Sequence, residues 1–245
     1  MKKLILGTTI LALGASVALA DGHGNTVRMG TEGAYPPYNF INDAGEVDGF
    51  ERELGDELCA RAELSCEWVK NDWDSIIPNL VSGNYDTIIA GMSITDERDE
   101  VIDFTQNYIP PAASAYVAAS ADADLTGGVI AAQTATIQAG YVAESGAALI
   151  EFATPEETVA AVRNGEADAV FADKDYLIPL VEDSGGDLVF AGEDVPLGGG
   201  VGLGLRESDG ELRDKFDAAI TSMKEDGTLN TMIKKWFGED ATVYE

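Results

Sequence analysis

Three charged side chains follow segments that the sequence predicts to be β-strands. Glu32 follows an apolar strand over 27–31, Arg98 lies in the stretch after a buried run over 85–90, and Asp173 follows a strand over 167–171. In open α/β sheets, ligands bind beyond the carboxyl ends of the strands, at loops and helix N-termini. We therefore expect the three side chains to share one site, with one cationic and two acidic groups.

This combination suits a ligand that carries both charges, such as an α-amino acid. A sequestered zwitterion must have its carboxylate and its ammonium paired. The planar guanidinium of Arg98 can bond both oxygens of a carboxylate, assisted by Ser93 and helix N–H groups, and Asp173 can pair with the ammonium. Each charge also has an ordinary alternative role: Arg98 in a surface ion pair with its acidic neighbours, Asp173 as a helix N-cap, Glu32 as a solvated loop charge.

The sequence offers little for nucleophilic or metal chemistry. Its only histidine, His23, lies in a Gly-rich segment, which removes any Ser/His/Asp or Cys/His arrangement from consideration. Its two cysteines, Cys59 and Cys66, have no histidine near them that would complete a metal site. We therefore expect no catalytic residue, no metal and no cofactor.

Composition narrows the class of protein further. The 245 residues include 15 Lys plus Arg against 44 Asp plus Glu, a formal charge of −29, and 45% of the chain is apolar. Such a composition is typical of a globular protein with a real core. The acidic balance, without any basic stripe, argues against binding to nucleic acid, which needs clustered Lys and Arg.

The first 20 residues have the pattern of a secretory signal peptide. A basic start, Met1-Lys2-Lys3, precedes an apolar run over 4–19 and the small-residue cleavage site Ala18-Leu19-Ala20. A transmembrane helix is the alternative for an apolar run of this length. We expect cleavage and export to the periplasm, and loss of the two lysines takes the charge from −29 to −31.

An oxidising compartment favours a disulfide between Cys59 and Cys66. Phe50, Leu54 and Leu58 recur every four residues, which predicts a helix over 51–62, and 64–70 has the pattern of a strand. The bond would join the end of this helix to that strand and contribute roughly 2–3 kcal/mol on the chain-entropy model. Two unpaired buried thiols are the alternative.

The rest of the pattern alternates strands and helices. After the strands and the helix already named, we expect a helix over 74–81 and a short helix over 96–101 that Thr95 caps. A second set follows, with strands around 117 and over 129–130, helices over 136–150, 155–165 and 174–182, and two C-terminal helices. This order predicts an α/β protein of two lobes, each with a parallel sheet covered by helices.

The motifs at these positions resemble those of the periplasmic amino-acid-binding proteins of ABC importers (solute-binding protein family 3). The resemblance is strongest to the lysine/arginine/ornithine- and histidine-binding branch, whose disulfide spacing is similar to that of Cys59 and Cys66, and it covers residues 27–237. It rests on five stretches: Glu32-Gly33-Ala34-Tyr35-Pro36-Pro37-Tyr38, Gly49-Phe50-Glu51, Asp72-Trp73-Asp74 to Leu80, Met92-Ser93-Ile94-Thr95-Asp96-Glu97-Arg98, and Asp226-Gly227-Thr228 to Trp236-Phe237-Gly238.

The resemblance implies a type II periplasmic-binding-protein fold. In that fold two lobes, each a mostly parallel sheet flanked by helices, are joined by two hinge strands and close over one amino acid. The expected division is a signal peptide over 1–20, lobe 1 over 25–110 and 202–245, and lobe 2 over 111–201, with a crossing near 107–111. The resemblance also implies a monomer that delivers its amino acid to the transmembrane subunits of an ABC permease.

The resemblance places Arg98 on the ligand carboxylate, together with Ser93 and backbone groups at Gly91 and Met92. The family usually has Gly-Thr-Thr in the facing loop of lobe 2, where this chain has Ala135-Thr136-Ile137. Thr136 can still donate to a carboxylate, whereas Ile137 has lost the hydroxyl, so that its contact is backbone-only or missing. Ala90 likewise stands where some members carry Ser.

The resemblance places Asp173 on the α-ammonium, Tyr35 and Trp73 beside the ligand side chain, and Glu32 at the far end of that side chain. From composition alone, Tyr35 and Trp73 would more often be core or lid residues. A sequestered Glu32 favours a cation, so that arginine, lysine or ornithine is the expected ligand; glutamine- and cystine-binding members are alternatives.

Two other classes of function remain open at this level. The same scaffold hosts dehydratases of the prephenate or arogenate type, in which Glu32 or Asp173 would have to serve as the acid or base. The chain also suits the detached sensory domain of a receptor that recruits a signalling partner. We expect a binding protein without catalytic activity.

Overall fold

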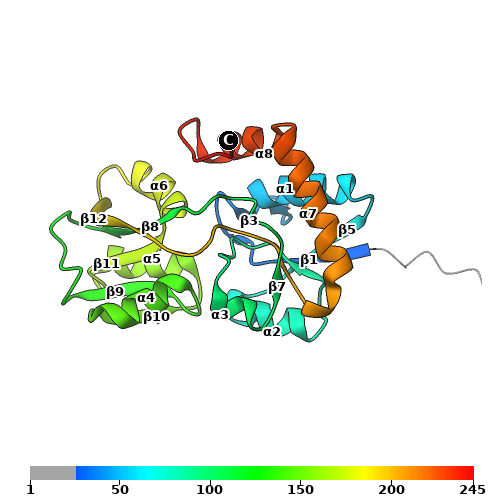
Figure 1. The fold of residues 1–245 in the computed structure, drawn as a ribbon. Coiled ribbons are helices and arrows are strands. Elements are labelled where there is room, and N and C mark those ends of the chain that lie inside the picture. The colour runs from blue at the N-terminus through cyan, green and yellow to red at the C-terminus, as the bar shows by residue number, and fades with distance from the viewer. Residues whose placement is uncertain (1–25) are drawn as a thin grey trace, which may run out of the picture.

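The structure is a computed structural model that describes residues 26–245, and it divides into two lobes that lie side by side (Figure 1). Each lobe is built on one five-stranded sheet with helices packed against it. The α/β class and the two-lobed architecture are therefore confirmed. The predicted signal peptide over 1–20 and His23 lie outside the described residues.

The sheet of lobe 1 has the strand order β5-β1-β6-β13-β7. Its strands are β1 (Thr26–Thr31), β5 (Ser65–Lys70), β6 (Thr87–Ile88), β7 (Asp103–Phe104) and β13 (Gly204–Leu205). β1 is parallel to β5 and β6, whereas β13 is antiparallel to both of its neighbours. Since β13 comes late in the sequence, lobe 1 is completed only after the chain has returned from lobe 2.

The sheet of lobe 2 has the strand order β10-β9-β11-β8-β12. Its strands are β8 (Ala113–Ala118), β9 (Val129–Gln133), β10 (Ala148–Phe152), β11 (Ala169–Asp173) and β12 (Val189–Pro196). β9 is parallel to β10 and β11, and β8 is antiparallel to β11 and β12. In both sheets the antiparallel pairings involve the strands that flank the crossings between lobes, so the sheets are mixed where mostly parallel ones were predicted.

Helices cover both sheets. In lobe 1, α1 (Phe50–Arg61) packs on β5 and against α7 (Gly210–Glu225) and α8 (Thr228–Phe237), and α2 (Ile76–Val81) packs on β1 and β6. In lobe 2, α4 (Ile137–Ser145) and α5 (Pro155–Arg163) pack on β9, and α6 (Lys174–Glu182) packs on β8. Phe50, Leu54 and Leu58 of α1 are fully buried, which confirms the predicted core-facing stripe.

Short elements fill the connections. A three-stranded meander precedes α1, and the single turns of η1 and α3 follow β5 and β6. They are β2 (Ala34–Tyr35), β3 (Asn39–Ile41), β4 (Val47–Asp48), η1 (Trp73–Ser75), α3 (Asp96–Asp99) and η2 (Glu207–Asp209). These connections carry several of the side chains that face the other lobe.

The chain crosses between the lobes twice, after β7 and after β12, and the two crossing segments lie side by side (Figure 1). The amide of Tyr108 donates to the carbonyl of Val201 at 2.7 Å, and the amide of Val201 donates to the carbonyl of Ile109 at 3.0 Å. The side chain of Asn107 adds a bond to the carbonyl of Gly199 at 3.0 Å. These contacts make a two-stranded connection, as the resemblance implied, and its first strand lies at the crossing expected near 107–111; the exact lobe limits, at 110/111 and 201/202, stay predictions.

One predicted helix is wrong in its second half. The expected helix over 136–150 ends at Ser145, because Gly146 adopts the left-handed conformation (φ 93°) that closes a helix. The residues that follow form strand β10, which pairs in parallel with β9. Strand β12 was also missed. Seven of its eight residues are half-buried or exposed, so its sequence lacks the alternation of apolar and polar residues that marks a strand with one buried face.

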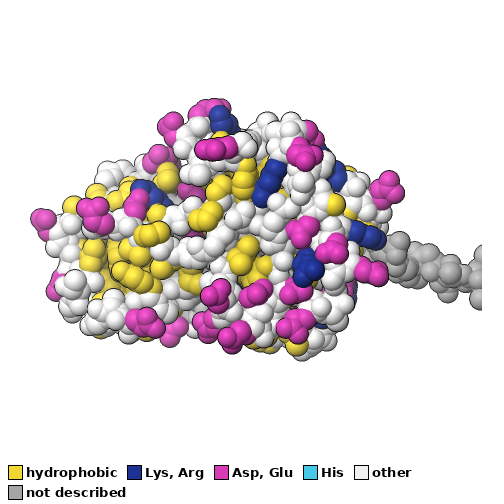
Figure 2. Space-filling model, viewed as in Figure 1, with side chains coloured by type: hydrophobic (Ala, Val, Ile, Leu, Met, Phe, Trp, Pro, Cys, Tyr) yellow, Lys and Arg dark blue, Asp and Glu magenta, His cyan; other side chains and the backbone are white. Residues whose placement is uncertain are grey.

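The predicted disulfide is present. Cys59, near the end of α1, is bonded to Cys66 in β5, so the bond joins the helix to the strand as the sequence indicated. Among residues 26–245, no helix combines the length and the apolar character that a membrane span requires. Figure 2 shows acidic side chains scattered over both lobes on the face it presents, in keeping with the formal charge of −29.

Candidate functional site

A cavity with an empty volume of about 480 Å³ lies between the lobes. All the residues predicted to bind a ligand line it except Met92, whose side chain is fully buried in the core of lobe 1. Its lining from lobe 1 is Glu32, Tyr35, Trp73, Ala90, Gly91, Ser93 and Arg98, and from lobe 2 Gln133, Thr136, Ile137, Gln138, Pro155, Thr158, Phe171, Ala172 and Asp173. Residues about 140 positions apart in the sequence thus share one chamber.

Arg98 is held by its own short helix and by both lobes. Thr95 caps α3 by accepting the amide of Arg98 at 3.2 Å. The guanidinium donates to the carbonyl of Ser93 at 2.8 Å and to the carbonyl of Ala135, across the cleft, at 3.3 Å, and it lies 5.4 Å above the ring of Trp73. Burial lowers the pKa of Arg98 to about 10, so it stays charged at neutral pH.

The guanidinium retains capacity for a carboxylate. Of its five N–H donors, two have partners within the described part of the chain. The facing loop adds the start of α4, where the first N–H groups, those of Ile137 and Gln138, have no acceptor within the helix. Arg98 and this helix end together form an anion site.

The hydroxyl of Thr136 is used by the protein itself. It donates to the carbonyl of Gln133 at 2.7 Å and accepts the amide of Ala139 at 3.1 Å, which makes it the N-cap of α4. The sequence had suggested that this hydroxyl donates to a ligand carboxylate. Its one proton is instead directed at the carbonyl of Gln133. Thr136 prepares the helix end, and the backbone beside it supplies the donors.

Asp173 ends β11 at the start of α6. It occupies the N-cap position of α6 but makes no capping bond with its side chain. Its carboxylate instead accepts the hydroxyl of Tyr35 at 2.8 Å and the amide of Gln138 at 2.9 Å. Burial raises the pKa of Asp173 to about 6, with Asp175 adding to the rise, so the group is largely ionised at pH 7 and able to pair with an ammonium.

Glu32 follows β1 and is only 5% exposed. One oxygen accepts the side-chain amide of Gln133, across the cleft, at 2.7 Å. Burial raises the pKa of Glu32 to about 7, and Asp72 raises it further, while the bond from Gln133 and the nearby Lys70 act in the opposite direction. A buried carboxyl of this kind binds a cation readily, because pairing removes the cost of its charge.

The two aromatic residues are fixed by packing. The ring of Tyr35 stacks on Tyr176 of lobe 2 with centroids 4.3 Å apart and an angle of 13°. Trp73 opens η1, is buried, and lies beneath Arg98. Both rings line the cavity as predicted, and both also have the packing role that composition alone had favoured.

A buried carboxylate holds the loop that carries Gly91. Glu51 of α1 is fully buried and accepts the amide of Gly91 at 2.6 Å, the side chain of Asn39 at 2.7 Å and the hydroxyl of Tyr108. Burial raises the pKa of Glu51, while these three bonds act in the opposite direction. Since its N–H is taken by Glu51, Gly91 offers a ligand its carbonyl rather than its amide.

Sequence reasoning assigned no role to two amides of the cavity. Gln133 and Gln138 bond to Glu32 and Asp173, the acids expected at the two ammonium positions. Gln133 ends strand β9, whose other residues are apolar and mostly buried, and a polar side chain in that position was the signal that could have singled it out. Thr158 and Phe171 complete the wall from lobe 2.

The arrangement provides an anion site and two acids within one cavity, with bonds across the cleft at Arg98, Glu32 and Asp173. Within residues 26–245, no group of three His, Cys, Asp or Glu side chains is placed to hold a metal ion. Two α/β lobes with a small cavity between them are the architecture of solute-binding proteins, which close around their ligand.

Comparison with known proteins agrees with this class. The model of the bacterial extracellular solute-binding proteins, family 3, matches residues 27–239, and the chain belongs to that family. The lysine/arginine/ornithine-binding periplasmic protein of Escherichia coli (strain K12) is 32% identical over all of this chain and 99% of its own length.

Solved structures show the same fold. A periplasmic His/Glu/Gln/Arg/opine family-binding protein from Silicibacter pomeroyi, in complex with lysine, is 87% identical, with a TM-score of 0.88 over 89% of this chain and all of its own. An ancestral arginine-binding protein bound to glutamine is 31% identical, with a TM-score of 0.81 over 88% of this chain and 99% of its own.

Proposed function

We propose that this protein captures a cationic amino acid (lysine, arginine or ornithine) in the periplasm and delivers it to the transmembrane subunits of an ABC permease. The observation that carries the proposal is the position of Glu32. It is a third charged group, buried in the same cavity as Arg98 and Asp173. An α-amino acid uses Arg98 and Asp173, which leaves Glu32 for a second positive charge at the end of the side chain.

Lobe closure is the mechanism. The ligand carboxylate binds Arg98 and the start of α4, the α-ammonium binds Asp173, and the distal cation binds Glu32. The ligand thus touches both lobes and stabilises the closed state by its differential contacts with it. A micromolar dissociation constant, about −8 kcal/mol, suffices for capture. No bond of the ligand is made or broken, and the permease receives it unchanged.

The relatives support this ligand class. The Silicibacter pomeroyi protein holds lysine, and the Escherichia coli relative is named for lysine, arginine and ornithine. Glutamine is the second candidate, because an ancestral arginine-binding protein holds it and because a carboxyl such as Glu32 can accept an amide hydrogen bond.

Thermal melting with a panel of amino acids tests the ligand class. A ligand present at 100 times its dissociation constant adds about 2.7 kcal/mol of stability, so the true ligand raises the melting temperature clearly. We expect lysine, arginine or ornithine to give the largest rise. A larger rise with glutamine would select the second candidate, and no rise with any amino acid, ornithine or cystine would refute the function.

Arg98→Gln tests the mode of binding. Removing the guanidinium should weaken binding by at least about 30-fold, equivalent to 2 kcal/mol, because the ligand carboxylate loses its charged partner. Arg213→Gln is the matched control, since Arg213 pairs with Asp103 and Asp214 away from the cavity. Titration calorimetry of both variants decides: equal affinity in Arg98→Gln and the control would contradict the assignment of the carboxylate site.

A further inference from the structure

The side chain of Gln133 bridges the two lobes at the far end of the amino-acid cavity. Gln133 is the last residue of β9 and is 8% exposed. Its amide nitrogen donates to Glu32 of lobe 1 at 2.7 Å and to the carbonyl of Ala153 at 3.1 Å. Both amide protons are therefore engaged, and the side chain is held across the cleft.

A second cavity lies on the other side of this bridge. It is partly open to solvent, with about 520 Å³ of space when the solvent at its mouth is included, and it shares Glu32 and Trp73 with the amino-acid cavity. Its other lining residues are Ala34, Lys70, Asp72, Asp74, Ala153 and Thr154. Since Glu32 faces both cavities and Ala153 lines the second one, the contacts of Gln133 with these two residues form part of the wall between them.

The second cavity is suited to a positive charge. Its lining contains the exposed carboxylates of Asp72 and Asp74, and Glu32 adds a third carboxyl from the shared wall. The one basic group of the lining is the ammonium of Lys70. A cation that extended past Glu32 would find acidic partners in this chamber. The bridge from Gln133 stands in its way, because a side chain long enough to enter must displace it.

We propose that Gln133 determines the longest ligand that the protein accepts. The inference rests on the proposed function. The bridge ends the amino-acid cavity at the length of lysine or arginine and excludes basic amino acids that are extended at the distal nitrogen. Shortening residue 133 joins the two cavities, and the second cavity then receives the distal cationic group of the longer ligand.

Titration calorimetry with two ligands tests this. L-lysine is the proposed ligand of the first cavity, whereas Nε-glycyl-L-lysine has an uncharged amide at Nε and carries its distal ammonium several bonds beyond. The measured quantity is the ratio of the two dissociation constants, in the wild type and in Gln133→Ala and Gln133→Met. We expect the ratio to shift at least tenfold toward the longer ligand in Gln133→Ala. The ratio should shift less than threefold in Gln133→Met, because methionine fills the space of the glutamine side chain but cannot form its hydrogen bonds.

A further variant tests whether the displaced distal ammonium of the longer ligand lies in the second cavity. Adding Asp72→Asn to Gln133→Ala should reverse the gain for the longer ligand at least threefold, measured as the ratio of the two dissociation constants. Gln133→Ser shortens the side chain in the same way and decides the question if Gln133→Ala is too unstable to purify.

The outcomes separate the two proposals. A wild type that binds lysine, with a ratio that is the same in the shortened variants, overturns the role of Gln133 and leaves the proposed function standing. So does a wild type that binds both ligands equally well. A wild type that binds no cationic amino acid overturns the proposed function and this inference with it.

Discussion

The hydroxyl of Tyr244 lies 2.8 Å from the carbonyl oxygen of Asn107 and 2.9 Å from its side-chain oxygen. Tyr244 is the penultimate residue of the chain, and Asn107 belongs to the first crossing between the lobes. Two further contacts hold the tail in place: Lys224 lies 3.9 Å from the centre of the Tyr244 ring, and the side chain of Asn230 bonds to the backbone of Tyr244. The C-terminal tail therefore braces the connection on which lobe closure depends.

Tyr244→Phe should loosen this connection without disturbing the packing of the ring. The variant keeps the contact with Lys224 and loses one hydrogen bond, for which we expect about 1 kcal/mol less free energy of unfolding. Hydrogen exchange should quicken at the amides of Tyr108 and Val201, which join the two crossings. Tyr141→Phe is the control, because Tyr141 is 37% exposed on lobe 2. Unchanged exchange at both amides would show that the tail does not brace the crossing.

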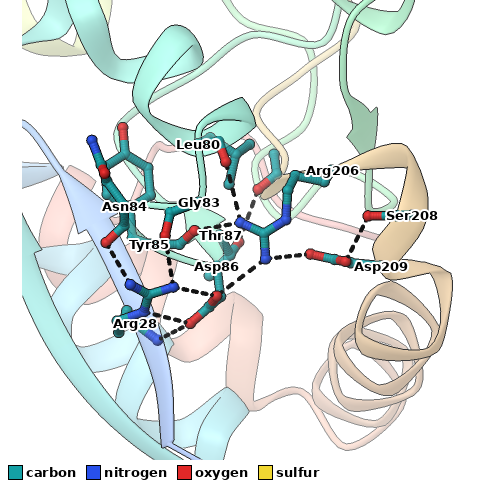
Figure 3. A network of polar contacts seen from close by, with 11 residues as sticks. Arg28, Leu80, Gly83, Asn84, Tyr85, Asp86, Thr87, Arg206, Ser208 and Asp209 are labelled. Atoms are coloured by element: carbon teal, nitrogen blue, oxygen red, sulfur yellow. Dashed lines mark hydrogen bonds and ion pairs between the residues drawn. The ribbon is translucent and has the colours of Figure 1, made fainter.

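A polar network ties β1 to the segments that precede β6 and follow β13 in lobe 1 (Figure 3), and none of its residues lines the amino-acid cavity. Asp86, just before β6, forms two bonds with the guanidinium of Arg28 in β1, at 3.0 and 2.8 Å, and one with Arg206, after β13, at 3.1 Å. These hydrogen bonds and the charge of Arg28 outweigh the effect of burial and lower the pKa of Asp86 to about 2 from its ordinary 3.8.

Asp86→Asn should therefore destabilise the protein in a pH-dependent way. A carboxyl whose pKa is lowered by folding adds stability above its unfolded pKa, and this stability disappears as the pH falls through the folded value. We expect a loss of about 2 kcal/mol at pH 7 that shrinks between pH 4 and pH 2. Urea unfolding at several pH values measures it. Lysine affinity should not change, since the network does not line the cavity, and a difference that is constant down to pH 2 would refute the account.

The charged residues of the site could be predicted from the sequence because each follows a strand of a parallel pair. Glu32 and Asp173 come directly after β1 and at the end of β11, and the parallel strands of each sheet bring such ends to one edge. The sequence cannot say how two edges from different lobes face each other, which is why the bond of Gln133 to Glu32 was missed. The same reason explains Thr136, whose hydroxyl was expected to face the ligand and instead caps α4.

The pattern of the chain failed where tertiary contacts override local preference. Strand β10 continues an apolar run that suits a helix, and only the conformation of Gly146 separates the two elements. Met92 was expected to contribute a backbone group, and the burial of its side chain with Ile88 and Ile102 in the core of lobe 1 leaves that expectation a prediction.

Ligand affinity should rise with pH between about pH 5 and pH 8. Burial raises the pKa of Glu32 to about 7, and that of Asp173 to about 6, so both groups are partly protonated in this range when no ligand is bound. A cationic ligand pairs with the ionised forms, so binding releases protons. Between pH 8 and pH 6 we expect the affinity for lysine to fall roughly tenfold, mainly because Glu32 becomes protonated.

Glu32→Gln separates the two contributions. In this variant the change in lysine affinity centred near pH 7 should vanish. A weaker pH dependence of the affinity, centred near pH 6 and due to Asp173, should remain. Calorimetry of lysine binding at pH 6.5, in two buffers of different ionisation enthalpy, counts the protons: roughly one released by the wild type and clearly fewer by Glu32→Gln. Glu67→Gln, at an exposed position of β5, should behave as the wild type. An affinity for lysine that is flat from pH 5 to pH 8 would mean that Glu32 does not face the ligand cation, because a carboxyl with a pKa near 7 cannot bind that cation without giving up its proton.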